Sequence, residues 1–169
     1  MKEINNSYYA IFTEEDKEFE VLFSLKNTFK DSEFFIPLEK TKSSLNGNIY
    51  YHFVRQMPCY IIVHDDNIVE KVGKILKIDD VLDVLSYTDS YNNKVPQKID
   101  REEIVKFLHS LKRHQEIEEL KGSKIIFICG QNTGKIGEVI SMDKGQLIVS
   151  INDGSKKVIK VSIWDTGVL

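Results

Sequence analysis

Apolar residues in the first part of the chain alternate between the spacing of strands and that of helices. Residues 8–13 are aromatic or β-branched and predict a first strand. Thr13 and the three acidic residues behind it have the pattern of a helix N-cap with favourable charges in the first turn. Apolar positions then recur near helical spacing, from Phe19 to Phe29. We therefore predict a helix over residues 14–29 with one apolar face.

Three strands are predicted before the next helix. They cover residues 33–41, 49–55 and 59–65. Pro37 lies inside the first of them and cannot donate a ladder hydrogen bond, so this strand either lies at a sheet edge or bends there. Asn46 and Gly47 form a hairpin signal ahead of the second strand.

The pattern then returns to helix, strand and helix. Residues 68–76 repeat apolar side chains with a helical period, and residues 81–87 are strand-like. Asp100 begins a variant of the capping box ahead of a third helix that ends near Leu111. Strands and helices in this order predict an α+β fold, with helices flanking an antiparallel sheet.

Residues 112–169 have a different pattern of apolar and polar positions. Residues 112–121 are highly charged and lose the apolar period, so we interpret them as a linker. Residues 122–169 hold four strand-like runs separated by glycine-containing turns. So few residues cannot form a large sandwich, and a small SH3-like β-barrel would close the sheet. The predicted organisation is a domain over 1–111, a linker over 112–121 and a barrel over 122–169.

A glycine-rich turn near residue 130 resembles a phosphate-binding loop but fails its requirements. Gly130 and Gly134 are separated by three residues instead of four, and Ile136 stands where the loop needs a hydroxyl. The following residues have no helical period, and phosphate binding needs a helix N-terminus. A β-turn between two strands is the favoured interpretation.

Composition and charge narrow the function classes. The net charge is −3, with −6 over residues 1–120 and +3 over residues 121–169, which disfavours a protein that coats nucleic acid by bulk charge. The chain has neither an apolar run long enough for a membrane span nor a secretory signal, so we expect a cytoplasmic protein that does not bind membranes. Cys59 and Cys129 are the only cysteines; a disulfide is possible, but two reduced thiols fit this compartment better.

Three stretches carry a resemblance to a known family. The sequence "GKIGEV" at 134–139, after an apolar strand and a turn, resembles a KOW motif, with Gly122, Gly134 and Gly137 as its structural glycines and Gly137 allowing a sharp turn. The sequence "YYAIFTEEDKEFEVLFSL" resembles the opening strand and helix of the NusG N-terminal domain, and "MPCYIIV" resembles the Pro-Gly-Tyr-hydrophobic stretch of that family. The chain is thus identified as similar to NusG-family transcription factors, and departures at two family sites suggest a specialised paralogue.

The resemblance implies a non-enzymatic, monomeric factor without cofactor. Its N-terminal domain, of the ferredoxin-like or RNP-like NusG fold, would bind the clamp helices of RNA polymerase near upstream DNA. Its KOW domain would recruit a second partner, such as a small-subunit ribosomal protein. The implied polymerase-binding residues are Tyr9, Met57, Pro58, Tyr60 and Tyr87. Alternation also predicts that Tyr8 and Tyr9 point to opposite faces, with at least one exposed.

Two smaller sets of residues follow from the same resemblance. Residues implied to contact upstream DNA or nascent RNA are Lys40, Lys42 and Arg55. The KOW partner site would lie in the loop Ile151, Asn152, Asp153 and Gly154, where the aromatic residue often found in the family is missing. Cys59 stands where the family usually has glycine, so a positive φ there would be strained.

Other interpretations stay open. The chain could be a LoaP-like antitermination regulator that binds an RNA hairpin directly, although its acidic N-terminal part disfavours this. The four histidines lack metal-binding spacing, and no nucleophile lies beside a base. We therefore predict neither a metal site nor an enzyme.

Overall fold

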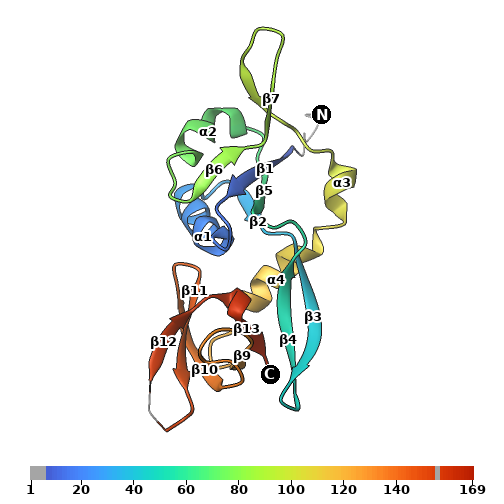
Figure 1. Ribbon diagram of the computed structural model, residues 1–169. Helices are drawn as coiled ribbons and strands as arrows, with labels where there is room; N and C mark the ends of the chain where they lie inside the picture. The colour runs from blue at the N-terminus through green and yellow to red at the C-terminus, as the bar shows by residue number, and fades with distance from the viewer. Residues whose placement is uncertain (1–6, 155–156) are drawn as a thin grey trace. The chain divides into compact units, whose positions relative to one another are not determined.

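The computed structural model describes residues 7–154 and 157–169. The chain divides into two compact units that are not two consecutive segments. The first unit contains Met1–Pro37 and Met57–Ser110, and the second contains Leu38–Gln56 and Leu111–Leu169. Both contain antiparallel strands and helices, which confirms a mixed α and β fold (Figure 1). The division at residues 111 and 122 stays a prediction from sequence motifs, since packing groups residues 38–56 with the C-terminal part.

The first unit is built on a four-stranded sheet in the order β2-β5-β1-β6. Its elements are β1 (Tyr8–Thr13), α1 (Glu18–Thr28), β2 (Glu33–Phe35), β5 (Tyr60–His64), α2 (Ile68–Ile75), β6 (Val81–Val84), β7 (Ser86–Thr88), β8 (Lys94–Pro96) and α3 (Arg101–Val105). Helix α1 packs against β2 and β5, and β7 and β8 form a separate two-stranded hairpin (Figure 1). β8 was not predicted from the sequence.

Helix α1 begins four residues later than predicted. Asp16 has a φ of 62°, so residues 14–17 form a turn and the helix starts at Glu18. The Thr13 hydroxyl donates to the backbone carbonyl of Glu14 and therefore does not cap the helix. The apolar face is confirmed, since Phe19, Leu22 and Leu25 are all buried.

Pro37 separates the predicted strand 33–41 into two strands. β2 ends at Phe35, and β3 begins at Leu38 in a different sheet. β2 lies at the edge of its sheet, as expected of a strand interrupted by proline. The bend at Pro37 also marks the first passage of the chain from one compact unit to the other.

The second unit contains a seven-stranded sheet in the order β12-β11-β10-β9-β13-β4-β3. Its elements are β3 (Leu38–Leu45), β4 (Asn48–Arg55), α4 (His109–Glu118, which starts in the first unit), β9 (Lys124–Phe127), β10 (Ile136–Asp143), β11 (Gln146–Ile151), β12 (Val158–Val161), the 3₁₀ turn η1 (Ile163–Asp165) and β13 (Thr166–Val168). Asn46 and Gly47 have φ values of 51° and 80° between β3 and β4, as a type I′ hairpin turn requires. The predicted hairpin is thus confirmed.

The hairpin of β3 and β4 packs on the C-terminal strands within this unit. Tyr51 pairs with Val168 of β13. A Cβ on Gly167 would lie 2.1 Å from the Tyr50 ring, so only glycine fits beside that buried ring. The Arg55 guanidinium lies 4.7 Å from the centre of the Trp164 ring, in cation–π geometry.

Most of the predicted linker is helical. Helix α4 covers residues 109–118, with His114 and Ile117 buried. The predicted third helix is also interrupted, because α3 ends at Val105 and α4 begins at His109. The apolar period of α4 runs through a histidine, which counted as polar in the sequence pattern.

Candidate functional site

The face of the first sheet that carries Tyr60 presents half-buried aromatic side chains. Phe12 of β1 pairs with Tyr60 of β5, and their ring centres lie 5.2 Å apart. Leu85 directly follows β6, its backbone N–H donates to the Ala10 carbonyl, and its side chain is 37% exposed. Alternation along β1 places Ala10 on the same face as Phe12. Phe12, Tyr60 and Leu85 therefore form one partly exposed apolar group, which we call the Tyr60 face.

Tyr9 lies on the opposite side of the sheet from Tyr60. It pairs with Val63, which is fully buried, and is itself only 9% exposed. The expectation that Tyr8 or Tyr9 is exposed was wrong, because the Tyr8 ring is also buried and stacks on His64 at 4.7 Å. Phe12, and not Tyr9, is the β1 residue beside Tyr60. Sequence reasoning missed it because the register between strands was unknown.

Met57, Pro58 and Cys59 form the turn that leads into β5. Met57 is half-buried and Pro58 is exposed, so both adjoin Tyr60 at the surface. Cys59 has a φ of 66°, the left-handed conformation that glycine adopts without strain. Its backbone N–H donates to the buried Glu18 carboxylate at 2.8 Å, which holds the turn against the start of α1.

Tyr87 lies apart from the sheet, in the hairpin of β7 and β8. It pairs with Val95 and is 53% exposed. The hairpin is joined to the sheet by a backbone hydrogen bond from Gln97 to the Leu85 carbonyl. Lys94 of β8 also lies 2.6 Å from both carboxylate oxygens of Asp83 on β6. Tyr87 is therefore an exposed aromatic side chain of the hairpin, two residues beyond Leu85 in the sequence.

The three residues predicted to contact nucleic acid differ in their availability. Lys40 forms an ion pair with Glu116 at 2.9 Å and also lies over the Tyr51 ring. Arg55 stacks on Trp164. Lys42 is exposed and forms no ion pair with any described residue. Lys42 is thus the member of this set whose charge is open to a phosphate.

The predicted partner loop of the second unit is only partly exposed. Ile151 is 2% exposed and belongs to the core, whereas Asn152, Asp153 and Gly154 are exposed. Asp153 forms an ion pair with Lys135 at 3.2 Å. This loop adjoins residues 155–156, which lie outside the described part of the chain.

The predicted structural glycines have different roles. Gly122 and Gly134 have φ values of 81° and 83°, so both need the left-handed conformation. Gly137 lies within β10, where a Cβ would come 2.5 Å from Val149 and 2.9 Å from the Ser150 carbonyl oxygen. Close packing against β11, and not a sharp turn, explains this glycine. The turn between β9 and β10 is followed by a strand, which agrees with the exclusion of a phosphate loop.

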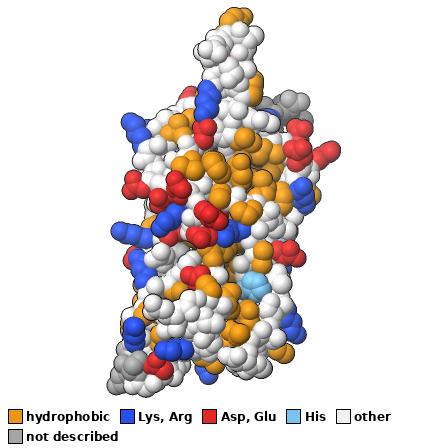
Figure 2. Space-filling model, in the orientation of Figure 1, with side chains coloured by type: hydrophobic (Ala, Val, Ile, Leu, Met, Phe, Trp, Pro, Cys, Tyr) orange, Lys and Arg blue, Asp and Glu red, His pale blue; other side chains and the backbone are white. Residues whose placement is uncertain are grey.

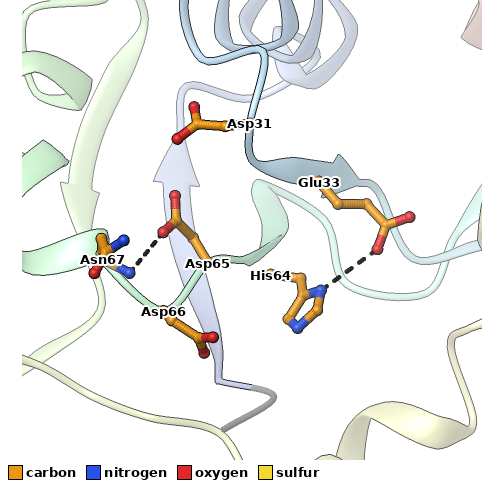
Figure 3. Close-up of a pocket in the computed structure, with 6 residues that line it drawn as sticks. All are labelled: Asp31, Glu33, His64, Asp65, Asp66 and Asn67. Atoms are coloured by element: carbon orange, nitrogen blue, oxygen red, sulfur yellow. Dashed lines mark hydrogen bonds and ion pairs between the residues drawn. The ribbon is translucent and has the colours of Figure 1, made fainter. Parts of the chain in front are cut away.

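A polar hollow of about 250 Å³ lies in the first unit (Figure 3). Its lining residues are Asp31, Glu33, His64, Asp65, Asp66 and Asn67. His64 Nδ1 lies 3.7 Å from the Glu33 carboxylate, and Asp65 accepts a hydrogen bond from the Asn67 N–H at 2.7 Å (Figure 3).

Lys71 of α2 neutralises one side of this hollow. Its ammonium lies 2.6 Å from Asp65 and 2.9 Å from Asp31. Burial by itself would raise the pKa of Asp65, but hydrogen bonds from Lys71, Ser32 and the Asn67 N–H outweigh it, so the pKa lies below its usual value. Burial likewise opposes the charge of Lys71, yet its two carboxylate partners raise its pKa. The arrangement is that of an ion-pair network that joins α2 to two loops.

The remaining candidates for chemistry are the metal-ligating and sulfur-containing side chains of the described residues. Among them, no group of three or more His, Cys, Asp or Glu side chains is placed to hold a metal ion. Neither cysteine forms a disulfide, and the thiol of Cys129 donates to an Asp165 carboxylate oxygen at 2.8 Å. No helix in the described ranges is long and apolar enough to span a membrane.

Comparisons with known proteins identify the family. A search among curated proteins finds no match. Among solved structures, similar chains include Thermotoga maritima NusG, from a study of its domain interaction, and the MjSpt4:Spt5 complex in conformation B. The first is 14% identical with 97% of each chain covered and a TM-score of 0.45; the second is 16% identical with 96% of each chain covered and a TM-score of 0.35. The family model described as transcription termination factor nusG matches residues 6–108, more than half of the sequence. The chain belongs to the NusG family.

Proposed function

We propose that this chain is a transcription elongation and antitermination factor that binds RNA polymerase through its first unit. The family match over residues 6–108 carries this proposal. The Tyr60 face supports the site, because Phe12, Tyr60 and Leu85 leave apolar area exposed beside Met57 and Pro58. Aromatic and methionine side chains bury a large area at modest entropic cost, which suits a protein interface.

The proposed activity is binding without covalent chemistry. The clamp helices of the polymerase are the proposed partner, and Tyr87 extends the contact along the β7–β8 hairpin. Lys42 is the proposed contact to upstream DNA or nascent RNA, since Lys40 and Arg55 have partners within the chain. Such a factor would act by holding the polymerase in its elongating state, as a monomer.

The second unit is proposed to be a KOW barrel that recruits a further protein. Asn152, Asp153 and Gly154 are exposed and form the proposed contact, with a small-subunit ribosomal protein as the partner class. Ile151 is excluded from the contact because it is buried. Its role is to pack the end of β11.

The proposal is tested by binding of the full chain to purified RNA polymerase. Removing one central aromatic anchor typically weakens an interface by more than 1 kcal/mol, so Tyr60→Ala should lower the affinity about tenfold. Phe12→Ala should have a similar effect, because the two rings adjoin. Val69→Ala is the control on α2, because Val69 is 66% exposed and is not one of the residues of the Tyr60 face. Unchanged binding of Tyr60→Ala and Phe12→Ala would overturn the assigned site.

A gel-shift series against salt separates this function from direct RNA-hairpin recognition. Binding through phosphates weakens steeply as salt rises. Tight and hairpin-selective binding of the isolated chain would favour the RNA-binding alternative. The acidic first part of the sequence and the internal partners of Lys40 and Arg55 support the polymerase-based function instead.

A further inference from the structure

The hairpin of β7 and β8 projects from the first unit and carries an aromatic residue at its end. Figure 1 shows this hairpin extending beyond the helices and the sheet of its unit. In Figure 2 the projection is narrow, with hydrophobic atoms at its tip. Tyr91, in the loop between the two strands, is 84% exposed, the largest exposed fraction among the large hydrophobic side chains of the described residues.

The loop that presents Tyr91 is held in one conformation. One carboxylate oxygen of Asp89 accepts hydrogen bonds from the backbone N–H groups of Tyr91 and Asn93, at 2.9 and 2.8 Å. The other oxygen accepts from the Asn93 side chain at 3.2 Å. Backbone hydrogen bonds from Asp89 to Asn93 and from Asn92 to Asp89 close the turn. These bonds hold the Asp89 carboxylate ionised and keep its pKa below the usual value.

A stiff loop with an exposed tyrosine has the properties of a recognition element. The loop residues 89–93 read Asp-Ser-Tyr-Asn-Asn. Tyrosine supplies a large contact area at low entropic cost, while serine and asparagine supply adaptable hydrogen bonds, and this composition is enriched in binding loops. Because the loop is already ordered, little entropy remains to be lost on binding.

The charges of the hairpin favour a protein partner over a nucleic acid. Between residues 86 and 97 the charged side chains are Asp89 and Lys94. Asp89 is bound to its own loop, and Lys94 is paired with both oxygens of Asp83. This segment therefore leaves no positive charge open for the phosphate contacts that dominate nucleic-acid affinity. An apolar pocket with a polar rim would match both the ring and the hydroxyl of Tyr91.

We infer that the β7–β8 hairpin is a second polymerase anchor, which inserts Tyr91 into an apolar pocket on the protein surface of RNA polymerase. The inference rests on the proposed function, and it extends that contact from the Tyr60 face through Leu85 and Tyr87 to the hairpin tip. Asp89 is a positioning residue that fixes the direction of the Tyr91 backbone.

Photo-crosslinking tests this anchor directly. The photo-crosslinking amino acid p-benzoyl-phenylalanine is placed in the full chain at position 91, at position 60 or at position 69. Each protein is added to elongation complexes assembled from purified polymerase, DNA and RNA. We expect crosslinks from positions 91 and 60 to polymerase subunits and none from position 69. A crosslink from 60 but none from 91, or one from 91 to nucleic acid, overturns the hairpin anchor while the proposed function stands. The absence of crosslinks from both 60 and 91 overturns both proposals.

Affinity measurements with the same complexes give a second criterion. Tyr91→Ala should weaken binding about tenfold or more, as expected for a buried aromatic anchor, while Tyr91→Phe should retain most of the affinity. Ser90→Ala is the matched control, because Ser90 is the exposed neighbour in the same loop. Tyr91 is so exposed that its replacement should leave the fold intact, which circular dichroism would verify. Equal affinities for Tyr91→Ala and Ser90→Ala would overturn the inference.

Discussion

Replacing Lys71 by methionine should destabilise the first unit far more than the same replacement at Lys94. Both lysines lie 2.6 Å from an aspartate, but their surroundings differ. The side chains of Lys71 and Asp65 are 18% and 4% exposed, whereas those of Lys94 and Asp83 are 62% and 41% exposed. The comparison therefore isolates the effect of burial on one kind of ion pair.

The expected loss of stability in each variant depends on the charge that the replacement leaves without its partner. Removing one partner of a buried ion pair costs about 3–5 kcal/mol, because the other charge is left uncompensated. Asp65 would keep hydrogen bonds from Ser32 and the Asn67 N–H, so we expect Lys71→Met to cost about 2–3 kcal/mol. Lys94→Met should cost less than about 1 kcal/mol, as exposed pairs do.

Urea unfolding of both variants and the unchanged protein, followed by circular dichroism, measures these costs. The pKa of Asp65 is lowered on folding, so its stabilisation is present above its unfolded pKa and is lost as pH falls through the lower folded value. The pKa of Lys71 is raised, so its contribution persists below its unfolded pKa and disappears only as pH rises through the folded value. The cost of Lys71→Met should be constant near neutral pH and shrink in acid. Equal costs for the two variants, or a Lys71 cost that does not change in acid, would refute this reasoning.

Two further replacements test local backbone and packing arguments. Cys59→Gly should raise the free energy of unfolding by up to about 1 kcal/mol, because glycine adopts a φ of 66° without strain. Cys59→Ala keeps the strain and should show no such gain in the same urea titration. Gly167→Ala should lower the free energy of unfolding by about 1–3 kcal/mol, because its Cβ would meet the Tyr50 ring at 2.1 Å. In a double-mutant cycle, Tyr50→Ala should remove much of that cost. Strictly additive effects of the two replacements would contradict the contact.

The sequence predicted local features well where a single residue type decides the conformation. Asn46-Gly47 forms its hairpin turn, Pro37 interrupts its strand, and the positive φ of Cys59 falls at the position where the family resemblance implied a glycine. In each case a steric property of one residue limits the backbone, so neighbours matter little.

Features that depend on register or on distant partners were harder to predict. Recognising Phe12, and not Tyr9, as the β1 neighbour of Tyr60 requires the pairing of β1 with β5, which no local pattern contains. Helix α4 was not predicted, because its buried face includes His114, which counted as polar in the sequence pattern. The Asp89 loop could have been suspected from its Asx-turn residues, but its projection from the unit depends on the short strands β7 and β8.

The assignment of residues 38–56 by packing to the second unit has a practical consequence for dividing the protein. The chain passes between units after Pro37, after Gln56 and after Ser110, so no single cut yields both units whole. Expression of residues 1–111 alone would retain the β3–β4 hairpin but discard the strand that covers Tyr50. In such a fragment, an aromatic ring that is buried in the intact chain would be exposed to solvent. Aggregation of the fragment would therefore not be evidence against the fold of the first sheet.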